Sequence, residues 1–185
     1  MRKIIFLDRD GVINRYPGDT KFVTSWRDFK FLPKAKHAIL RLTEAGYNIF
    51  VVSNQAGVSQ GLYKKERLDL ITRNMLNQIK SYGGNIKNVF YCIHTTEDNC
   101  SCRKPKTGLI DKSFRCLGAK PKAQDLKNIY FIGDSIRDVK TGKNANLKTI
   151  LVLSGREHIK NKKRWAYQPD YIFNDLREAV DFILS

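Results

Sequence analysis

The stretch KIIFLDRDGVIN, residues 3–14, guides the interpretation of the rest of the chain. Its four consecutive apolar residues, Ile4–Leu7, are typical of a strand that is buried on both faces, as in a parallel sheet. Two aspartates, Asp8 and Asp10, follow at once, where the chain turns at Gly11. Because side chains alternate along an extended segment, both carboxylates are expected on the same side. Like charges so close together repel each other unless a cation or a shared proton holds them, which indicates a chemical site.

Short apolar runs alternate with amphipathic stretches along the whole chain. Strands are predicted at residues 3–7, 48–52, 89–93, 129–132, 149–153 and 171–173. Helices are predicted at 33–45, 64–82, 108–117, 135–145 and 175–184. The first helix has Pro33 at its start and Gly46 after its end, and Asn174 or Asp175 is expected to cap the last. This order predicts an α/β fold with a parallel sheet and helices on both faces. No repeat or linker divides the chain, so a single domain over residues 1–185 is expected.

The overall composition limits the class of protein. Of the 185 residues 42% are hydrophobic, and no apolar run approaches the roughly 20 residues of a membrane span. The N-terminus does not resemble a signal peptide, so a cytoplasmic protein without a membrane partner is expected. The net charge of +16 favours an anionic partner: nucleic acid, an acidic membrane or a polyphosphorylated metabolite. Only residues 156–165, REHIKNKKRW, form a basic patch, which we interpret as a solvated loop.

Polar side chains follow four of the predicted strands. Asp8 and Asp10 end the first, and the second runs into Ser53, Asn54 and Gln55. The third leads into CIHTTEDNCSCRKPKTG, residues 92–108, and the fourth ends at Gly133 and Asp134, with Asp138 four residues later. Ligands of open α/β sheets bind beyond the carboxyl ends of the strands. Parallel strands therefore bring these residues to one rim, whereas a lone Asp-x-Asp or Gly-Asp pair is usually a turn.

The residue types at this rim indicate phosphate chemistry. Asp8, Asp10 and Asp134 around one point suit a hard cation with oxygen ligands, for which Mg²⁺ is the first choice. Because Mg²⁺ commonly takes phosphate oxygens as further ligands, a phosphorylated substrate is expected. One carboxylate attacks phosphorus, and another protonates the leaving oxygen and then activates water. Ser53 donates a hydrogen bond to the phosphoryl oxygens and Lys104 neutralises their charge, while Gly11 permits a close backbone approach.

A second metal site is predicted in residues 92–102. Cys92, His94, Cys100 and Cys102 supply the four ligands of a closed, structural zinc site. In a chain without an export signal, cysteines are expected to be reduced, which favours a metal over disulfides. The alternative is a set of buried cysteines beside a surface histidine. Cys116 lies in a predicted helix and is expected to be a buried apolar residue.

Four of these segments together resemble the motifs of the haloacid dehalogenase-like (HAD) superfamily of phosphohydrolases. They are FLDRDGVIN, VVSNQAG, the Lys104-Pro105 step and FIGDSIRD. The resemblance implies a Rossmann-like three-layer α/β/α sandwich with a mainly parallel sheet. It implies Asp8 as nucleophile and Asp10 as general acid/base, with Mg²⁺ on the Asp8 side chain, the Asp10 carbonyl and Asp134. Asp138 would act on the metal from its outer shell, and Ser53 and Lys104 would stabilise the transferring phosphoryl group.

The zinc loop also resembles that of D-glycero-D-manno-heptose 1,7-bisphosphate phosphatases and their histidinol-phosphatase relatives. This implies removal of the 7-phosphate of the heptose bisphosphate. The short gaps between the motifs leave no room for a cap domain, and a monomer is expected. Substrate contacts are then expected from Gly11, Asn54, Gln55, Arg103, Ser135 and, in the loop 15–26, Asp19. Ser135 stands where the heptose enzymes usually carry lysine, so the exact substrate stays open. Histidinol phosphate, a polynucleotide 3′-phosphate and a non-catalytic binding module are the alternatives.

Overall fold

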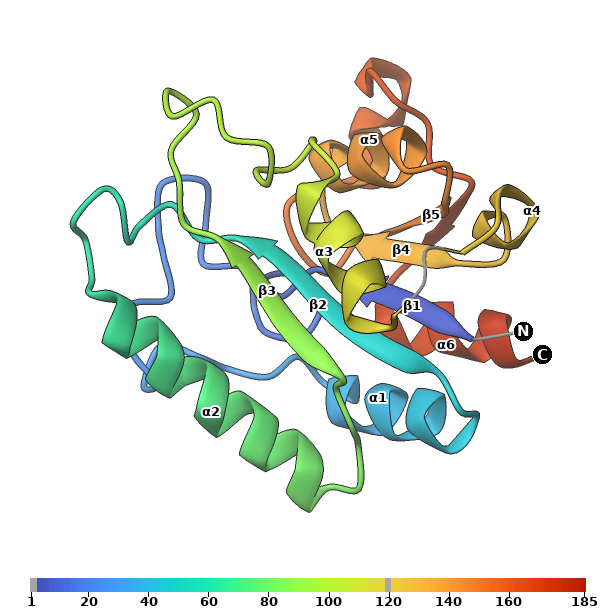
Figure 1. The fold of residues 1–185 in the computed structure, drawn as a ribbon, viewed down its shortest axis with the longest axis horizontal. Helices are drawn as coiled ribbons and strands as arrows, with labels where there is room; N and C mark the ends of the chain where they lie inside the picture. Colours follow the sequence, from blue (N-terminus) through green and yellow to red (C-terminus); the bar gives the residue numbers. More distant parts are fainter. Residues whose placement is uncertain (1–2, 119–120) are drawn as a thin grey trace.

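The computed structural model describes residues 3–118 and 121–185, and it has one sheet of six parallel strands (Figure 1). The strands are β1 (Ile4–Leu7), β2 (Asn48–Asn54), β3 (Asn88–Cys92), β4 (Tyr130–Gly133), β5 (Lys148–Val152) and β6 (Tyr171–Phe173). The helices are α1 (Ala35–Glu44), α2 (Lys65–Ser81), α3 (Gly108–Cys116), α4 (Ala123–Leu126), α5 (Ile136–Asn144) and α6 (Leu176–Leu184), with a 3₁₀ helix η1 (Ile159–Arg164). The strand order is β3-β2-β1-β4-β5-β6. The three-layer α/β prediction is confirmed.

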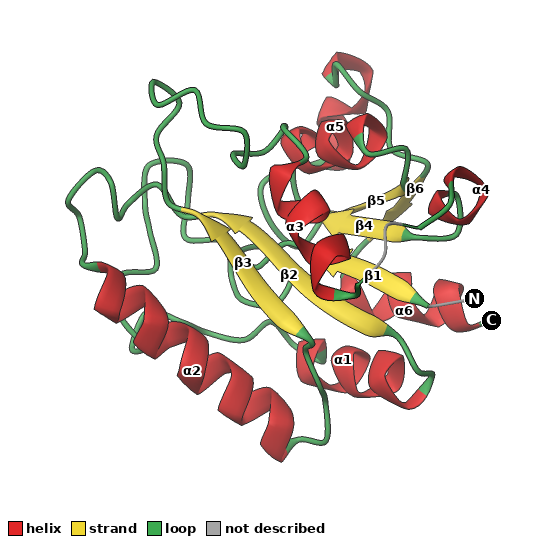
Figure 2. Ribbon diagram, viewed as in Figure 1, coloured by secondary structure: helices red, strands yellow, loops and turns green. Residues whose placement is uncertain are grey.

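Helices cover both faces of the sheet, as Figure 2 shows. Along β1, Ile5 and Leu7 join the apolar core beneath α1, α2 and α6, whereas Ile4 and Phe6 join the core beneath α3 and α4. Each strand residue therefore meets a packed layer, which is why β1 is an unbroken apolar run in the sequence. No helix in the described part of the chain is long and apolar enough to cross a membrane.

Phenylalanine rings join the central strands on the α3 side of the sheet. The Phe6 ring stacks with Phe50 of β2 and Phe131 of β4, at centroid distances of 5.8 and 6.3 Å. The edge of a fourth ring, that of Phe114 in α3, meets Phe6 at 5.5 Å. Aromatic pairs in these geometries add to the energy of their buried area. The central strands, whose ends carry the predicted site, are therefore firmly held.

The boundaries of the predicted strands and helices agree with the structure to within two residues, but the short helix α4 was not predicted, and there are local differences. Pro33 is not the first helical residue, because Lys34 adopts a left-handed conformation with φ 59° before α1 begins. The cap of α6 is Asp175, whose carboxylate accepts the Glu178 N–H at 2.9 Å. The basic patch, interpreted as a loop, contains the 3₁₀ helix η1.

One expectation from the sequence is wrong: Cys116 is exposed. The buried side of α3 is formed by Leu109, Ile110, Ser113 and Phe114. Cys116 lies in the last turn of the helix, beyond the edge of that buried arc. An apolar residue type in an amphipathic helix was therefore insufficient to indicate burial.

Candidate active site

The carboxyl ends of β1, β2 and β4 surround a cavity of about 330 Å³. The predicted residues that line it are Asp8, Asp10, Asp19, Ser53, Asn54, Gln55, Arg103, Lys104, Asp134, Ser135 and Asp138. Gln60 and Arg137 also line it and were missed from the sequence. Tyr16 and Lys21 of the loop 15–26 and Arg156 of the basic patch line it too, although no site role was expected of them individually. Arg156 had a signal, because it follows the end of β5 at the same edge of the sheet.

Three carboxylates meet at the bottom of this cavity. One oxygen each of Asp8, Asp134 and Asp138 lies within 4.8 Å of the other two. The ammonium of Lys104 is 2.9 Å from Asp8 Oδ2 and 2.5 Å from Asp138 Oδ1. All four residues are buried, with 8% or less of their surface exposed. With all four groups ionised, three carboxylates and one ammonium would leave two net negative charges in a buried place.

This buried negative charge shifts the ionisation of the cluster. Burial raises the pKa of Asp8, and the Lys104 charge opposes that shift only in part. Burial, followed by the negative charges of Asp138 and Asp8, raises the pKa of Asp134 well above its ordinary value. Burial alone would lower the pKa of Lys104, but the carboxylates of Asp138 and Asp8 outweigh it and raise that pKa. Burial therefore favours the neutral form of the Asp8 and Asp134 carboxyls, whereas Lys104 keeps its charge.

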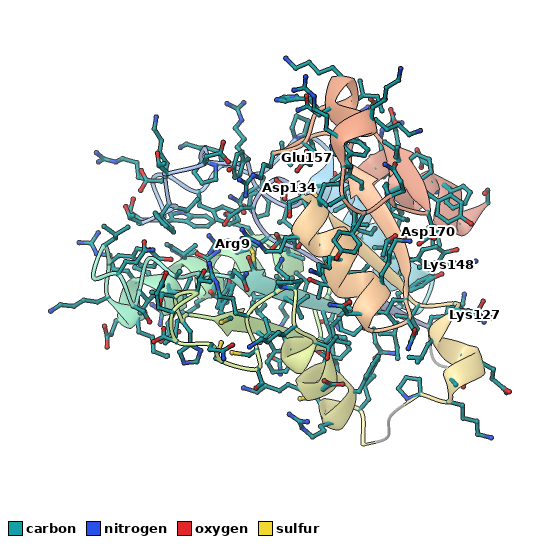
Figure 3. The ribbon with its side chains drawn as sticks, turned by 90° about the horizontal axis from the view of Figure 1, so that it is seen from above. Arg9, Lys127, Asp134, Lys148, Glu157 and Asp170 are labelled. Atoms are coloured by element: carbon teal, nitrogen blue, oxygen red, sulfur yellow. The ribbon has the colours of Figure 1, made fainter. Side chains whose placement is uncertain are left out.

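Asp134 is fixed between two turns. Its Oδ2 accepts the Arg156 N–H at 2.8 Å, and its carbonyl accepts the Glu157 N–H at 3.1 Å. Asp134 and Glu157 are labelled in Figure 3. A Cβ on Gly11 or Gly155 would lie 2.1 or 2.0 Å from that same Oδ2. Gly11 also has φ +77°, where a side chain is strained. Both glycines are therefore needed for the carboxylate to take this position.

Asp138 has two functions in the local structure. Its Oδ2 accepts the Ser135 hydroxyl at 2.6 Å and the Ser135 N–H at 3.2 Å, which caps the start of α5. Its Oδ1 faces Lys104. A Cβ on Gly133 would lie 2.2 Å from the Asp138 Cβ, so glycine at the end of β4 lets α5 approach. The predicted substrate contact Ser135 thus has its hydroxyl committed to Asp138.

The Asp10 carboxylate is outside the three-carboxylate cluster. It accepts hydrogen bonds from Arg9 Nε at 3.1 Å, Asn14 Nδ2 at 2.8 Å and Gln55 Nε2 at 2.9 Å. The third carboxylate beside Asp8 is therefore that of Asp138. The carboxylate of Asp10 still lines the same cavity.

Residues at the end of β2 and in the loop after β3 position the lysine and the hydroxyl. Asn54 pairs with the Lys104 backbone: its Oδ1 accepts the Lys104 N–H at 3.0 Å, and its Nδ2 donates to the Lys104 carbonyl at 3.2 Å. Ser53 is buried, and its side-chain hydrogen bond with Asp8 lowers the pKa of that carboxyl against the larger effect of burial. Arg103 donates to the His94 carbonyl at 2.9 Å, which ties the cavity wall to the cysteine-rich loop.

The loop of residues 15–26, where a substrate contact from Asp19 was expected, forms one side of the cavity mouth. Tyr16 donates its hydroxyl to Asp19 Oδ1 at 2.6 Å. The same Asp19 oxygen lies 3.0 Å from Nε of Arg156, across the mouth. The loop of residues 15–26 is thereby linked to the turn that holds Asp134.

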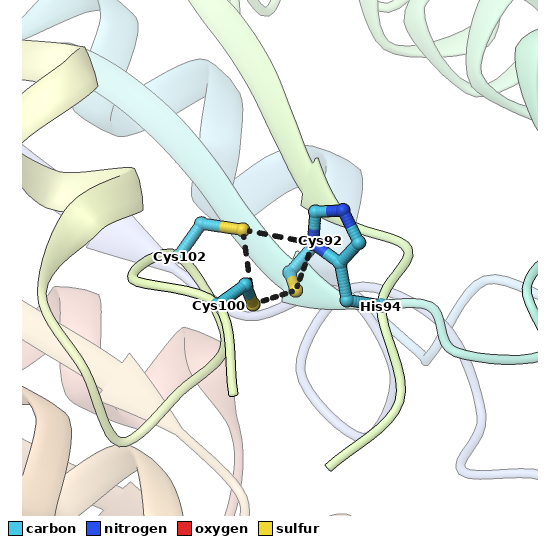
Figure 4. A group of neighbouring side chains, drawn as sticks. All are labelled: Cys92, His94, Cys100 and Cys102. Carbon is cyan, nitrogen blue, oxygen red and sulfur yellow. Dashed lines mark hydrogen bonds between the residues drawn. The ribbon is translucent and has the colours of Figure 1, made fainter. Parts of the chain in front are cut away.

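Two sets of side chains fit metal ions. The cluster of Asp8, Asp134 and Asp138 offers carboxylate oxygens and a net negative charge, the donor set that Mg²⁺ prefers. Figure 4 shows the second set, at the end of β3 and in the loop that follows it: Cys92, His94, Cys100 and Cys102.

The sulfur and nitrogen atoms of this second set lie 3.4–3.7 Å apart along four edges. A tetrahedral zinc with bonds of about 2.0–2.3 Å needs edges of about 3.5–3.8 Å between its ligands. Although burial opposes ionisation, hydrogen bonds from Cys102 and the Arg103 backbone lower the pKa of Cys100 to about 6. The four side chains fit zinc in both distance and chemistry.

Comparison with known proteins places the chain in a family. Residues 101–179 match the HAD-hydrolase-like family model. The chain is 30% identical over 184 residues to the D-glycero-beta-D-manno-heptose-1,7-bisphosphate 7-phosphatase of Pseudomonas aeruginosa, covering 100% of this chain and 99% of that one. It is 34% identical over 185 residues to the enzyme of the same name from Neisseria meningitidis serogroup A, covering 99% and 95%.

A solved structure agrees with this likeness. The D,D-heptose 1,7-bisphosphate phosphatase from B. bronchiseptica, complexed with magnesium and phosphate, superposes with a TM-score of 0.88 at 31% identity, covering 98% of each chain. The fold and the site define a HAD-like phosphatase. Within that superfamily the chain belongs to the family of the heptose-1,7-bisphosphate phosphatases.

Proposed function

We propose that this protein is a Mg²⁺-dependent phosphatase that removes the 7-phosphate of D-glycero-D-manno-heptose 1,7-bisphosphate through an aspartyl-phosphate intermediate. The observation that carries the proposal is the buried cluster of Asp8, Asp134, Asp138 and Lys104 beneath a cavity mouth that contains further cations. The names of the relatives and the magnesium and phosphate in the solved relative support it. We further expect one domain over residues 1–185 that acts as a cytoplasmic monomer.

The proposed reaction has two steps at phosphorus. In the first, the Asp8 carboxylate attacks phosphorus, the ester bond breaks, and Asp10 protonates the departing oxygen of the sugar. In the second, Asp10 takes a proton from water, which attacks phosphorus and releases Asp8 and inorganic phosphate. Ser53 and the Lys104 ammonium, 2.9 Å from Asp8, offset the charge of the transferring group.

The oxygen ligands proposed for magnesium are the Asp8 and Asp134 carboxylates and the Asp10 carbonyl. When bound, the ion supplies positive charge that reduces the repulsion between the attacking carboxylate and the phosphate. Asp138 acts from the outer shell through Lys104, to which it is ion-paired. The Asp134 carboxylate can occupy this position only because Gly11 and Gly155, which pack against it, have no side chain.

The cavity mouth supports a bisphosphate as substrate. Lys21, Arg103, Arg137 and Arg156 line it, and a second phosphate remote from the reacting one needs such charges. Arg103 and the loop residue Asp19 are proposed as contacts to the sugar phosphate, with Gly11, Asn54, Gln55 and Ser135 nearer the reacting group. No lysine follows Asp134, so the arginines carry this charge.

The test is phosphate release with and without Mg²⁺ on both anomers of the heptose bisphosphate, histidinol phosphate, fructose 1,6-bisphosphate and a 3′-phosphorylated oligonucleotide. We expect one heptose anomer to exceed the other substrates in kcat/KM by orders of magnitude, and Asp8→Asn to be inactive. Preference for the oligonucleotide or for histidinol phosphate would reject the substrate but keep the chemistry. Activity of Asp8→Asn equal to the wild type would reject the chemistry.

We also propose that Cys92, His94, Cys100 and Cys102 hold a structural zinc ion, which orders the loop before Arg103 and Lys104. Metal analysis should find about one zinc per chain, lost in Cys102→Ser together with a lower melting temperature. The matched control is Cys116→Ser, since Cys116 is exposed and outside the cluster. Wild-type protein that takes up no zinc after exposure to the metal would contradict this site.

A further inference from the structure

Arg9 lies between the two motif aspartates and, among the residues that the structure describes, is the largest fully buried side chain, with 0% of its surface exposed. An arginine next to a nucleophile is the obvious candidate to bind the phosphate. However, Arg9 is absent from the residues that line the cavity. Its guanidinium faces Asp10 instead, with Nε at 3.1 Å and Nη2 at 3.0 Å from Asp10 Oδ1.

The guanidinium holds both oxygens of the Asp10 carboxylate. Nη2 is also 3.0 Å from Asp10 Oδ2, and it donates to Gln55 Oε1 at 3.0 Å. A buried charge is costly unless it is paired and hydrogen-bonded, so the pairing of Arg9 with Asp10 sets the orientation of both side chains. A forked donor restricts a carboxylate more than a single ammonium does.

Gln55 completes the support from the other side. Its Oε1 accepts from Arg9 Nη2 and from the Tyr63 hydroxyl, the latter at 2.8 Å. With that oxygen engaged by two donors, the Gln55 amide nitrogen faces Asp10 Oδ2 at 2.9 Å. Asn14 adds a further hydrogen bond to Asp10 Oδ1 at 2.8 Å. The carboxylate is therefore held by three side chains at once.

The back of Arg9 is packed as well. Its guanidinium carbon lies 5.6 Å from the centre of the Tyr91 ring on β3. The Tyr91 hydroxyl accepts from Thr72 of α2 at 3.0 Å. Ring, strand and helix thus restrict the movement of the arginine, so its position is set by the fold and not by a bound substrate.

We propose that Arg9 is a positioning residue that fixes the Asp10 carboxylate for proton transfer to the leaving oxygen, with Gln55 and Tyr63 as its support. The inference rests on the proposed role of Asp10 as general acid. Arg9 acts through Asp10 and does not touch the phosphate. Loss of Arg9 is therefore expected to lower kcat/KM most for substrates whose leaving group must be protonated as it departs.

The experiment measures kcat/KM for the heptose bisphosphate and for p-nitrophenyl phosphate in wild type, Arg9→Lys and Asp10→Asn. Because kcat/KM includes steps only up to release of the first product, it isolates the leaving-group step from hydrolysis of the aspartyl-phosphate. General acids contribute about 10²–10⁴-fold to such steps. We expect Arg9→Lys to lose about 10–100-fold on the sugar phosphate and less than about 3-fold on p-nitrophenyl phosphate, whose leaving group needs little protonation.

Matched variants separate positioning from folding. Tyr63→Phe leaves Arg9 intact and removes one donor to Gln55, so a smaller loss with the same dependence on leaving group is expected. Arg41→Lys, an arginine paired with Asp181 on the far helices, should behave as wild type. Circular dichroism and urea unfolding establish that each variant is folded.

The possible outcomes are distinct. Equal losses on both substrates in folded Arg9→Lys, or no loss on either, overturn the inference. If Arg9→Lys does not fold, Tyr63→Phe decides, and the absence of any dependence on leaving group in that variant overturns it too. If Asp10→Asn itself loses activity equally on both substrates, the proposed role of Asp10 fails. That result is separate from a failure of Arg9 alone.

Discussion

Replacing Lys104 with methionine should destabilise the metal-free protein by several kcal/mol at neutral pH. The ammonium lies 2.9 Å from Asp8 and 2.5 Å from Asp138, and it is 4% exposed. Methionine keeps most of the length of the side chain but removes its charge. Removing one partner of a buried ion pair costs about 3–5 kcal/mol, a large share of the roughly 5–15 kcal/mol of a domain. We expect the free energy of unfolding at pH 7.5 to fall by that amount.

The loss should shrink in acid. Burial raises the folded-state pKa of Asp8 and of Asp134 above the ordinary 3.8, so the folded protein binds protons that the unfolded chain does not. Stability therefore falls as pH rises from 3.8 to the raised folded value, by up to about 1.4 kcal/mol per pH unit for each carboxyl. Without Lys104, which lowers the pKa of Asp8, this window extends further upward. Lys104 itself has a pKa raised above 10.5, so its charge is constant between pH 5.0 and 7.5.

The assay is urea unfolding in EDTA at pH 7.5 and pH 5.0. The control is Lys160→Met, an exposed lysine of η1 that should change stability by less than about 0.5 kcal/mol. We expect the Lys104→Met deficit to be at least about 1 kcal/mol smaller at pH 5.0. A deficit below about 1 kcal/mol at pH 7.5, or one that is unchanged at pH 5.0, would refute the view that Lys104 compensates the carboxylates.

Three further changes test the fold and the site. Phe6→Ala removes a fully buried ring and should cost about 3–5 kcal/mol in urea unfolding; a loss under about 1 kcal/mol would contradict its central packing. Asp175→Ala removes the acceptor for the Glu178 N–H and should cost about 1 kcal/mol by the same assay, whereas no loss would mean that the cap is replaced. Gly155→Ala places a Cβ 2.0 Å from Asp134 Oδ2, so the Mg²⁺ concentration for half-maximal activity should rise about 10-fold or more; an unchanged value would show that the turn yields instead.

The fold was predictable because its strands are buried on both faces and are therefore unbroken apolar runs. The order of the strands was not, because β1 pairs with β2 and β4 through crossovers that leave no local pattern. The left-handed Lys34 before α1 was also missed. A lysine in the sequence does not indicate the left-handed conformation, which glycine and asparagine adopt far more often.

The site was predictable where it depends on topology alone. Asp8 and Asp134 directly follow β1 and β4, and Lys104 lies in the loop after β3. Parallel strands bring such residues to one edge of the sheet. The direction of the Asp10 side chain was not predictable. Alternation placed it beside Asp8, but the buried Arg9 offers its carboxylate a stronger partner. The competition between two partners is decided by packing, which the sequence pattern does not contain.

The charges of the site are arranged in two layers that select opposite partners. At the bottom, three carboxylates outnumber one lysine, and burial weakens the screening that salt would provide. A divalent cation held there by the carboxylate oxygens would offset the negative charge that an approaching phosphate meets. At the mouth, cations such as Arg103 and Arg156 attract an anion. Because Asp134 accepts the backbone N–H of Arg156, the two layers share one turn of the chain. The position of the proposed metal ligand and that of the cation above it are therefore set together by the turn that follows β5.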